Sequence, residues 1–176
     1  MAGPLEGIKV LDLTRFLAGA YCTMVLGDLG AEIIKVEHPQ GGDPSRNVGP
    51  HYDGDVSSYF LSVNRGKRSV TLDLKTEKAK NAVFRLAARS DIVVENFVPG
   101  AMERFGLGYE TLREKNPGII YAACSGFGRT GPYARRTAFD MLIQGMAGTV
   151  SITGEPDRPP VRAGFSIGDI GASMFL

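Results

Sequence analysis

Short apolar runs alternate with helical patterns along most of the chain. Ile8 to Thr14 has the alternation of a strand, and residues 18–30 follow it with apolar side chains at helical spacing. The same patterns predict strands at residues 31–36, 69–74, 91–95 and 118–123. The patterns predict one helix that begins after a Thr76 cap and two short helices at residues 99–104 and 109–115. They also predict a largely buried helix at residues 138–152. This alternation predicts an α/β fold, in which a mostly parallel sheet carries helices on both faces.

Three stretches rich in Gly, Pro and polar residues interrupt the pattern, at residues 37–58, 125–136 and 153–168. We expect the first to be a long functional loop. Ligands of parallel sheets bind beyond the carboxyl ends of the strands. The predicted ligand site is therefore lined by the loops that follow Thr14, Val36, Leu74, Glu95 and Ala123.

The charge balance disfavours nucleic acid as a partner. The chain has 20 Lys and Arg residues against 19 Asp and Glu residues, without the basic excess that binding to a phosphate backbone requires. Its uncharged runs are shorter than the ~20 residues of a membrane-spanning helix. The first residues lack the basic and apolar regions of a secretory leader. We therefore expect a cytoplasmic protein with no membrane partner, in which Cys22 and Cys124 are buried, reduced thiols.

Several familiar site patterns are missing from the sequence. The loop after the first strand, RFLAGA, lacks the GxGxxG spacing of a dinucleotide site. His38 and His51 are the only histidines, and neither has a second ligand at short spacing, so no metal is expected. Glu37 is predicted to be solvated at its strand end. Two interpretations stay open for one basic run, a solvated face or an anion site: Lys67, Arg68, Lys75, Lys78 and Lys80.

Two carboxylates stand alone among small or apolar residues, Asp140 and Asp169. Such acids are more often helix caps or paired core acids than catalysts. From the residues alone, the prediction stops at a cytoplasmic α/β protein with a ligand site lined by loops.

Five long strings resemble the class III CoA-transferases, the CaiB/BaiF family, in the same order and spacing. The strings are PLEGIKVLDLTR, LAGAYCTMVLGDLGAEIIKVEHPQGGDPSR, YFLSVNRGKRSVTLDLK, DIVVENFVPGAMERFGLGYETL and SGFGRTGPYARR. The resemblance implies a Rossmann-like large domain, a smaller second domain and two subunits interlocked as a homodimer. Because members of the family are longer, residues 1–176 are expected to be the N-terminal part of the large domain, without the small domain.

The resemblance also implies that coenzyme A, as CoA or acyl-CoA substrate, runs along the predicted loops. The residues that match the CoA-binding positions of the family are Phe16, Leu17, Ala18, His38, Leu72, Lys75, Asn96, Phe97, Arg104 and Phe105. The cations Lys75 and Arg104 suit the phosphates of the nucleotide end. Some relatives carry Arg where this chain has His38, and a mostly neutral imidazole holds phosphate less firmly. Lys75 is expected to share that contact.

The catalytic acid of the family stands at a Gly-Asp step before small residues, which here is Gly168 and Asp169. The resemblance therefore implies that Asp169 is the nucleophile of a ping-pong exchange between an acyl-CoA and a small carboxylic acid, without a metal. Backbone N–H groups at the start of this helix are expected to stabilise the oxyanion.

Two other functions are compatible with parts of the sequence. The α-methylacyl-CoA racemases of the same family pair this aspartate with a histidine, and Phe139 stands at that position and carries no proton. CoA transfer is therefore preferred over a racemase reaction, with Asp140 as a structural acid or secondary site residue. The alternative from another class is a non-catalytic CoA-binding module.

Overall fold

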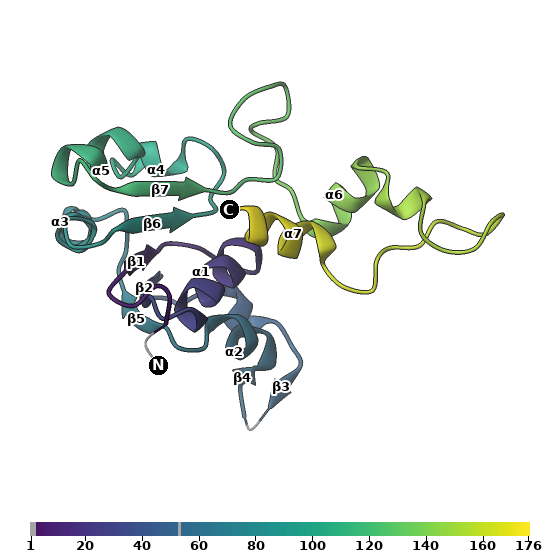
Figure 1. The fold of residues 1–176 in the computed structure, drawn as a ribbon, viewed down its shortest axis with the longest axis horizontal. Coiled ribbons are helices and arrows are strands. Elements are labelled where there is room, and N and C mark those ends of the chain that lie inside the picture. The colour runs from purple at the N-terminus through teal and green to yellow at the C-terminus, as the bar shows by residue number, and fades with distance from the viewer. Residues whose placement is uncertain (1–2, 53) are drawn as a thin grey trace.

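The computed structural model describes residues 3–52 and 54–176 and is built around one parallel sheet (Figure 1). All neighbouring strands of this sheet run parallel. Their order is β5 (Arg68–Thr71), β2 (Glu32–Glu37), β1 (Lys9–Asp12), β6 (Ile92–Glu95) and β7 (Ile120–Ala123). The chain moves outward from β1 in one direction and then returns to β6 on its other side. This order confirms the predicted α/β class and makes the β1–β6 boundary a topological switch point.

Helices cover both faces of the sheet, as predicted. One apolar cluster includes Leu11 and Val93 and packs on the α3 (Glu77–Ala87) face, where Val83 is fully buried. A second cluster holds the neighbouring strand residues Val10 and Val94 on the other face. Consecutive strand residues thus point to opposite sides, and both sides are apolar because each is covered. The remaining helices of this layered part are α1 (Ala18–Asp28), α4 (Ala101–Arg104) and α5 (Tyr109–Lys115).

The segment predicted as a loop at 37–58 contains regular structure. It includes a 3-10 turn, Pro44–Asn47, and a short hairpin formed by β3 (His51–Tyr52) and β4 (Val56–Ser57). The helix α2 (Ser58–Asn64) follows directly and was not predicted. The Ser57 hydroxyl caps α2 by accepting a hydrogen bond from the Phe60 N–H at 3.1 Å. The Ser57 cap was the sequence signal available for this helix.

The segment after β7 forms an arm that leaves the sheet and returns (Figure 1). It contains α6 (Asp140–Met146), a 3-10 turn at Thr149–Ser151 and α7 (Ile167–Phe175), which packs against α1. The prediction of a largely buried helix at 138–152 is wrong, because in α6 only Asp140 and Gln144 are buried. An apolar composition shows that a helix could be buried, but burial also requires a neighbouring element that covers it. The helix α6 lies away from the sheet and the helices that pack on it. No helix within the described ranges is long and apolar enough to cross a bilayer.

Candidate functional site

The loops after β1 and β6 diverge at the switch point and are tied together by one side chain. The Arg15 N–H donates to Asn96 Oδ1 at 2.8 Å, and Asn96 Nδ2 donates to the Arg15 carbonyl at 2.7 Å. The Asn96 amide thus pairs with the Arg15 backbone as a neighbouring strand would. This tie joins the two loops into one wall, with the turn of residues 13–18 on one side and residues 96–99 on the other.

Two adjoining hollows of about 200 and 160 Å³ lie against this wall. We call them together the Asp169 cavity, since the Asp169 side chain lines both. Five of the predicted CoA-binding residues also line this cavity: Phe16, Leu17, Ala18, Asn96 and Phe97. The structure therefore brings the predicted nucleophile and the predicted loops after β1 and β6 to one place.

A second, narrower cavity of about 50 Å³ shares Phe97 in its lining with the Asp169 cavity. We call it the His38 cavity. Its lining includes five predicted residues: His38, Leu72, Lys75, Phe97 and Phe105. Phe97 lines both cavities and makes an edge contact with Phe105, with ring centroids 6.2 Å apart. The exposed side chain of Arg104, on α4, lines neither cavity.

Asp169 lies in the first turn of α7 and is partly buried. Burial raises the pKa of its carboxyl group above the usual value, and the nearby Asp140 carboxylate raises it further. Within residues 3–52 and 54–176, no side chain donates a hydrogen bond to this carboxylate. Asp169 is therefore a desolvated acid without a cationic partner, as nucleophiles and proton carriers in clefts often are.

Asp140 has a structural role that links α6 to α7. Its Oδ1 accepts hydrogen bonds from the N–H groups of Gly168, at 2.8 Å, and Asp169, at 3.4 Å. Its Oδ2 accepts from Gln144 Nε2 at 2.6 Å. The prediction of a capping acid is confirmed for Asp140, although it caps the helix that follows its own. We expected the first N–H groups of α7 to bind an oxyanion. This is wrong for the N–H groups of Gly168 and Asp169, because both already donate to Asp140.

Two basic side chains at the cavities were not predicted from the sequence. Arg136 lines the Asp169 cavity, and Arg15 lines the His38 cavity with its guanidinium 4.7 Å from the Phe97 ring centroid. Each is a basic residue in a loop that follows a strand, and this position was the sequence signal that could have identified it. Phe139 lines the Asp169 cavity and contacts Phe16, with ring centroids 6.5 Å apart. The aromatic side chain that replaces the racemase histidine thus faces the predicted nucleophile's cavity.

Two expectations about charged residues are wrong. Glu37 is buried, and burial alone would raise its pKa, but hydrogen bonds from Arg46 and Ser69 lower that pKa to about 2. The Lys67 side chain is only 2% exposed and donates to Asp12 Oδ2 at 3.0 Å and to Asn64 Oδ1 at 3.0 Å. Both side chains are buried by contacts with residues distant in the sequence, such as Ser69 for Glu37 and Asp12 for Lys67. The Lys67 ammonium is occupied by these contacts, which leaves the exposed Lys75 as the cation of the basic run that lines the His38 cavity.

The prediction that both cysteines are buried, reduced thiols is confirmed in part. Both thiols are free, but only Cys22 is buried, whereas Cys124 is partly exposed and lines the Asp169 cavity. Burial raises the pKa of the Cys124 thiol, and Asp169 raises it further, so the thiolate is disfavoured. In the described part of the chain, no three His, Cys, Asp or Glu side chains are grouped to hold a metal ion.

Comparison with known proteins gives matches along the whole chain. The sequence is 47% identical over 172 residues to a succinyl-CoA:glutarate CoA-transferase of Mus musculus, covering 98% of this chain and 39% of the mouse protein. It is 50% identical over 176 residues to a succinyl-CoA:mesaconate CoA-transferase of Haloarcula hispanica, covering 96% of this chain and 44% of that protein. The chain thus spans less than half the length of these relatives.

The fold has a close counterpart among solved structures. A CaiB/BaiF family protein from Brucella suis superposes with a TM-score of 0.95 at 45% sequence identity, over 99% of this chain and 47% of that one. The sequence profile of CoA-transferase family III matches residues 5–176. With that match added to the parallel sheet and the switch-point cavities, the chain belongs to CoA-transferase family III.

Proposed function

We propose that this protein transfers coenzyme A from an acyl-CoA donor to a small carboxylic acid, with Asp169 as the nucleophile. The observation that carries the proposal is the position of Asp169 in one cavity with Phe16, Asn96 and Phe97. The names of the mouse and archaeal relatives, which pair succinyl-CoA with glutarate or mesaconate, support the reaction class and make dicarboxylic acids the first acceptors to test.

The two cavities suit the two ends of an acyl-CoA. The His38 cavity offers Lys75 for a phosphate group and the ring edges of Phe97 and Phe105 for the apolar part of the nucleotide. The Asp169 cavity lies across Phe97 and suits the thioester end. A CoA molecule that passes Phe97 would thus contact both sets of predicted residues. In this arrangement Asn96 acts mainly by holding the Arg15 backbone.

The first half of the reaction forms a covalent link to the chain. An Asp169 carboxylate oxygen attacks the thioester carbonyl, the C–S bond breaks, and CoA leaves as the thiolate. The product is a mixed anhydride between Asp169 and the donor acyl group. The thiolate then attacks the Asp169 carbonyl, releasing the donor acid as a carboxylate and leaving an aspartyl-CoA thioester.

The second half repeats these steps with the acceptor. The acceptor carboxylate attacks the aspartyl thioester and displaces the CoA thiolate, which gives a new anhydride. The thiolate then attacks the acceptor acyl carbon, which yields the new acyl-CoA and restores the Asp169 carboxylate. No proton or electron is gained or lost over the cycle.

The surroundings of Asp169 favour this role. Partial burial and Asp140 disfavour its charged form, as the direction of its pKa shows. Acylation removes that charge, so each covalent intermediate relieves the desolvation that the free carboxylate bears. A carboxylate of raised basicity is also a stronger nucleophile while it is ionised.

The proposal is tested by trapping the intermediate on the complete protein. After incubation with succinyl-CoA, hydroxylamine converts an acylated aspartate to a hydroxamate, which peptide mass spectrometry locates. We expect the label at Asp169, no transfer by Asp169→Ala, and wild-type activity in Glu114→Ala, which removes an exposed acid on α5. A label at Asp140, or transfer retained by Asp169→Ala, would overturn the assignment.

We also propose that the complete protein is a cytoplasmic homodimer. Exposed apolar side chains along the arm support an additional contact surface, among them Ile152 at 86% exposure and Phe165 at 54%. Light scattering on the complete protein tests this assembly, with the mass of a dimer as the expected result.

A further inference from the structure

The turn between β1 and α1 adopts a backbone conformation that its sequence does not favour. Phe16 has a φ of +57°, in the left-handed region that bulky residues rarely enter. No glycine relieves the turn at this position. Strained residues of this kind persist only where the surrounding structure holds them. Phe16 lines the Asp169 cavity, so its conformation shapes the wall beside the proposed nucleophile.

Side chains from three other segments hold the backbone of this turn. The Thr14 carbonyl accepts a hydrogen bond from Lys35 Nζ at 2.8 Å. Arg15 is held on both sides by Asn96. The Phe16 N–H donates to Asp43 Oδ1 at 3.2 Å. Each of three consecutive residues is therefore fixed by a side chain that lies at least 20 positions away in the sequence.

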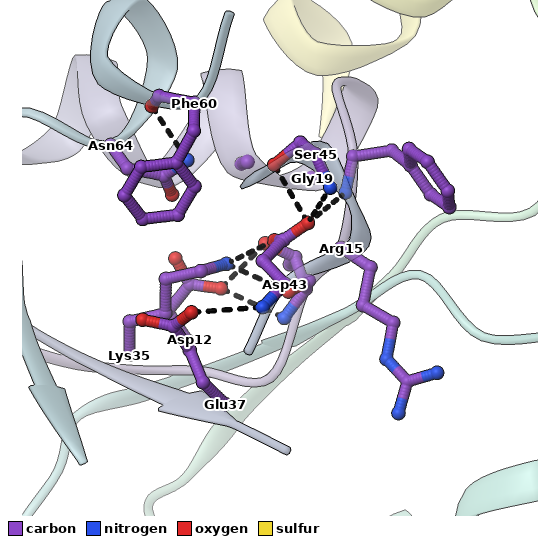
Figure 2. Close-up of polar contacts among 12 residues, drawn as sticks. Asp12, Arg15, Gly19, Lys35, Glu37, Asp43, Ser45, Phe60 and Asn64 are labelled. Carbon is purple, nitrogen blue, oxygen red and sulfur yellow. Dashed lines mark hydrogen bonds and ion pairs between the residues drawn. The ribbon is translucent and has the colours of Figure 1, made fainter. Parts of the chain in front are cut away.

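Asp43 is itself fixed from all sides (Figure 2). Only 2% of the residue is exposed, and its Oδ2 lies 2.9 Å from Lys35 Nζ. Its Oδ1 also accepts from Ser45, at 2.9 Å from the N–H and 2.8 Å from the hydroxyl. Its own N–H donates to Glu37 Oε2 at 2.9 Å. A carboxylate held this firmly can impose a conformation on the residue that it contacts.

We propose that Asp43 is a positioning residue for acyl transfer, which holds Phe16 in its left-handed conformation and thereby sets the shape of the Asp169 cavity. The proposal rests on the transfer activity proposed above. Asp43 lines the His38 cavity, yet its bond to Phe16 reaches the wall of the other cavity. Its charge is neutralised by Lys35, so its contribution to the reaction is geometric.

The test compares three variants of the complete protein. Asp43→Ala removes the acceptor for Phe16, whereas Asp43→Asn keeps an oxygen in its place. Leu112→Ala, in the fully buried part of α5, lowers stability far from the turn. We expect Asp43→Ala to lower kcat about tenfold or more, because small displacements at a reacting centre are costly. The Kd for free CoA should change less than about threefold, since the contacts of the nucleotide end remain.

The conservative and control variants separate positioning from folding. Asp43→Asn should recover most of the lost kcat, and Leu112→Ala should lower Tm with kcat unchanged at temperatures where it is folded. The proposal is overturned if Asp43→Ala keeps the wild-type kcat, or if its loss lies entirely in CoA affinity. Should Asp43→Ala fail to fold, Ser45→Ala takes its place, because it removes one bond to the same Oδ1. A kcat below wild type with unchanged CoA affinity then supports the proposal, and a wild-type kcat overturns it.

A second measurement does not depend on activity. Hydrogen exchange of the peptide containing the Phe16 amide should be faster in the Asp43 or Ser45 variant than in wild type and unchanged in Leu112→Ala. If the wild-type protein transfers no CoA but the amide exchanges faster, the proposed function fails while the hold of Asp43 on the turn stands. If exchange is unchanged in every variant, Asp43 does not hold the turn and the inference fails.

Discussion

At the scale of single residues, two carboxylates show how their surroundings shift the pKa of an acid in opposite directions. Glu37 accepts hydrogen bonds from Arg46 Nε at 2.7 Å and Ser69 Oγ at 2.6 Å, and its pKa falls to about 2 despite burial. Asp169 is partly buried beside a second acid, and no cation of residues 3–52 or 54–176 forms an ion pair with it, so its pKa rises. The surroundings thus stabilise the charged form of Glu37 and disfavour the charged form of Asp169.

The raised pKa of Asp169 predicts a gain of stability when its charge is removed. Its folded-state pKa lies above the unfolded value of 3.8, so ionisation destabilises the fold as pH rises through the folded pKa. Asp169→Asn should therefore unfold at higher urea concentration than wild type at pH 7, with the difference shrinking as pH falls from the raised folded pKa toward 3.8. Urea titrations across this range provide the measurement, and a less stable variant at pH 7 would contradict the expectation.

Glu37 should show the opposite pH dependence. Its folded pKa is about 2 against an ordinary 4.5, so its contribution to stability is present above pH 4.5 and is lost as pH falls toward 2. Because Arg46 is partly exposed and screened by water, we expect Glu37→Gln to cost on the order of 2 kcal/mol at pH 7. The cost should shrink in acid. The same urea titrations measure it, and a cost that grows as pH falls would refute this account.

The positions of Lys75 and Arg104 predict unequal roles in CoA binding. Lys75 lines the His38 cavity, whereas Arg104 lies outside both cavities. A charge-assisted contact to phosphate contributes about 1.5–3 kcal/mol, so Lys75→Ala should weaken CoA binding roughly tenfold or more. Arg104→Ala should have the smaller effect. Calorimetry on the complete protein measures both, and an unchanged Kd in Lys75→Ala would remove that residue from the proposed site.

At the scale of elements, the β1–α1 unit depends on a close approach of α1 to the end of β1. A Cβ added at Gly19 would lie 2.4 Å from Thr14 Cγ2 and 3.3 Å from Asn96 Cγ. Both neighbours are held in place, Thr14 by Asp12 and Asn96 by Arg15. A glycine is therefore required where the first turn of α1 meets the switch point.

This packing predicts a local effect of Gly19→Ala. The methyl group would displace Thr14 or Asn96, and overpacking of this kind typically costs about 1–3 kcal/mol. We expect a lower Tm together with reduced transfer activity in the complete protein, because the same turn carries Phe16. Gly145→Ala is the matched control, since a Cβ at that helical position in α6 meets nothing within 4 Å. Wild-type Tm in Gly19→Ala would show that α1 can shift without cost.

At the scale of the whole molecule, a well-packed layered part contrasts with an arm whose apolar side chains remain exposed. Figure 1 shows α6 and the following loop extending away from the sheet. Phe175 is 95% exposed and Met174 is 73% exposed at the end of α7. Exposed apolar surface of this extent is typical of a contact site for another domain or subunit.

The exposed apolar residues predict that the 176-residue chain associates with itself in solution. Sedimentation velocity should show a mass that rises with concentration. Ile152→Ser and Phe175→Ser should weaken this association, because each removes apolar surface from the arm or the end of α7. Leu61→Ser is the control, since Leu61 is an exposed apolar residue of α2, outside the arm. A monomer at every concentration would contradict the prediction.

The sequence by itself determined the layered part of the fold. Alternation located all five strands of the parallel sheet within a few residues, and the Thr76 cap and apolar spacing located α3. These signals succeed because an element that buries one face must repeat its apolar residues with its own period. The family's motifs also predicted Phe16 and Asn96, which lie on the two loops that meet at the switch point.

Only the tertiary structure decided how the charged and capping residues are used. Asp12 meets Lys67 across 55 positions of the sequence, and Asp140 caps a helix that begins 27 residues later. No local pattern specifies such pairs, because a buried ion pair depends on which segments the fold brings together. The exposure of α6 also depends on the tertiary structure. An apolar helix is buried only if another layer covers it, and the sheet of this chain does not extend to the arm.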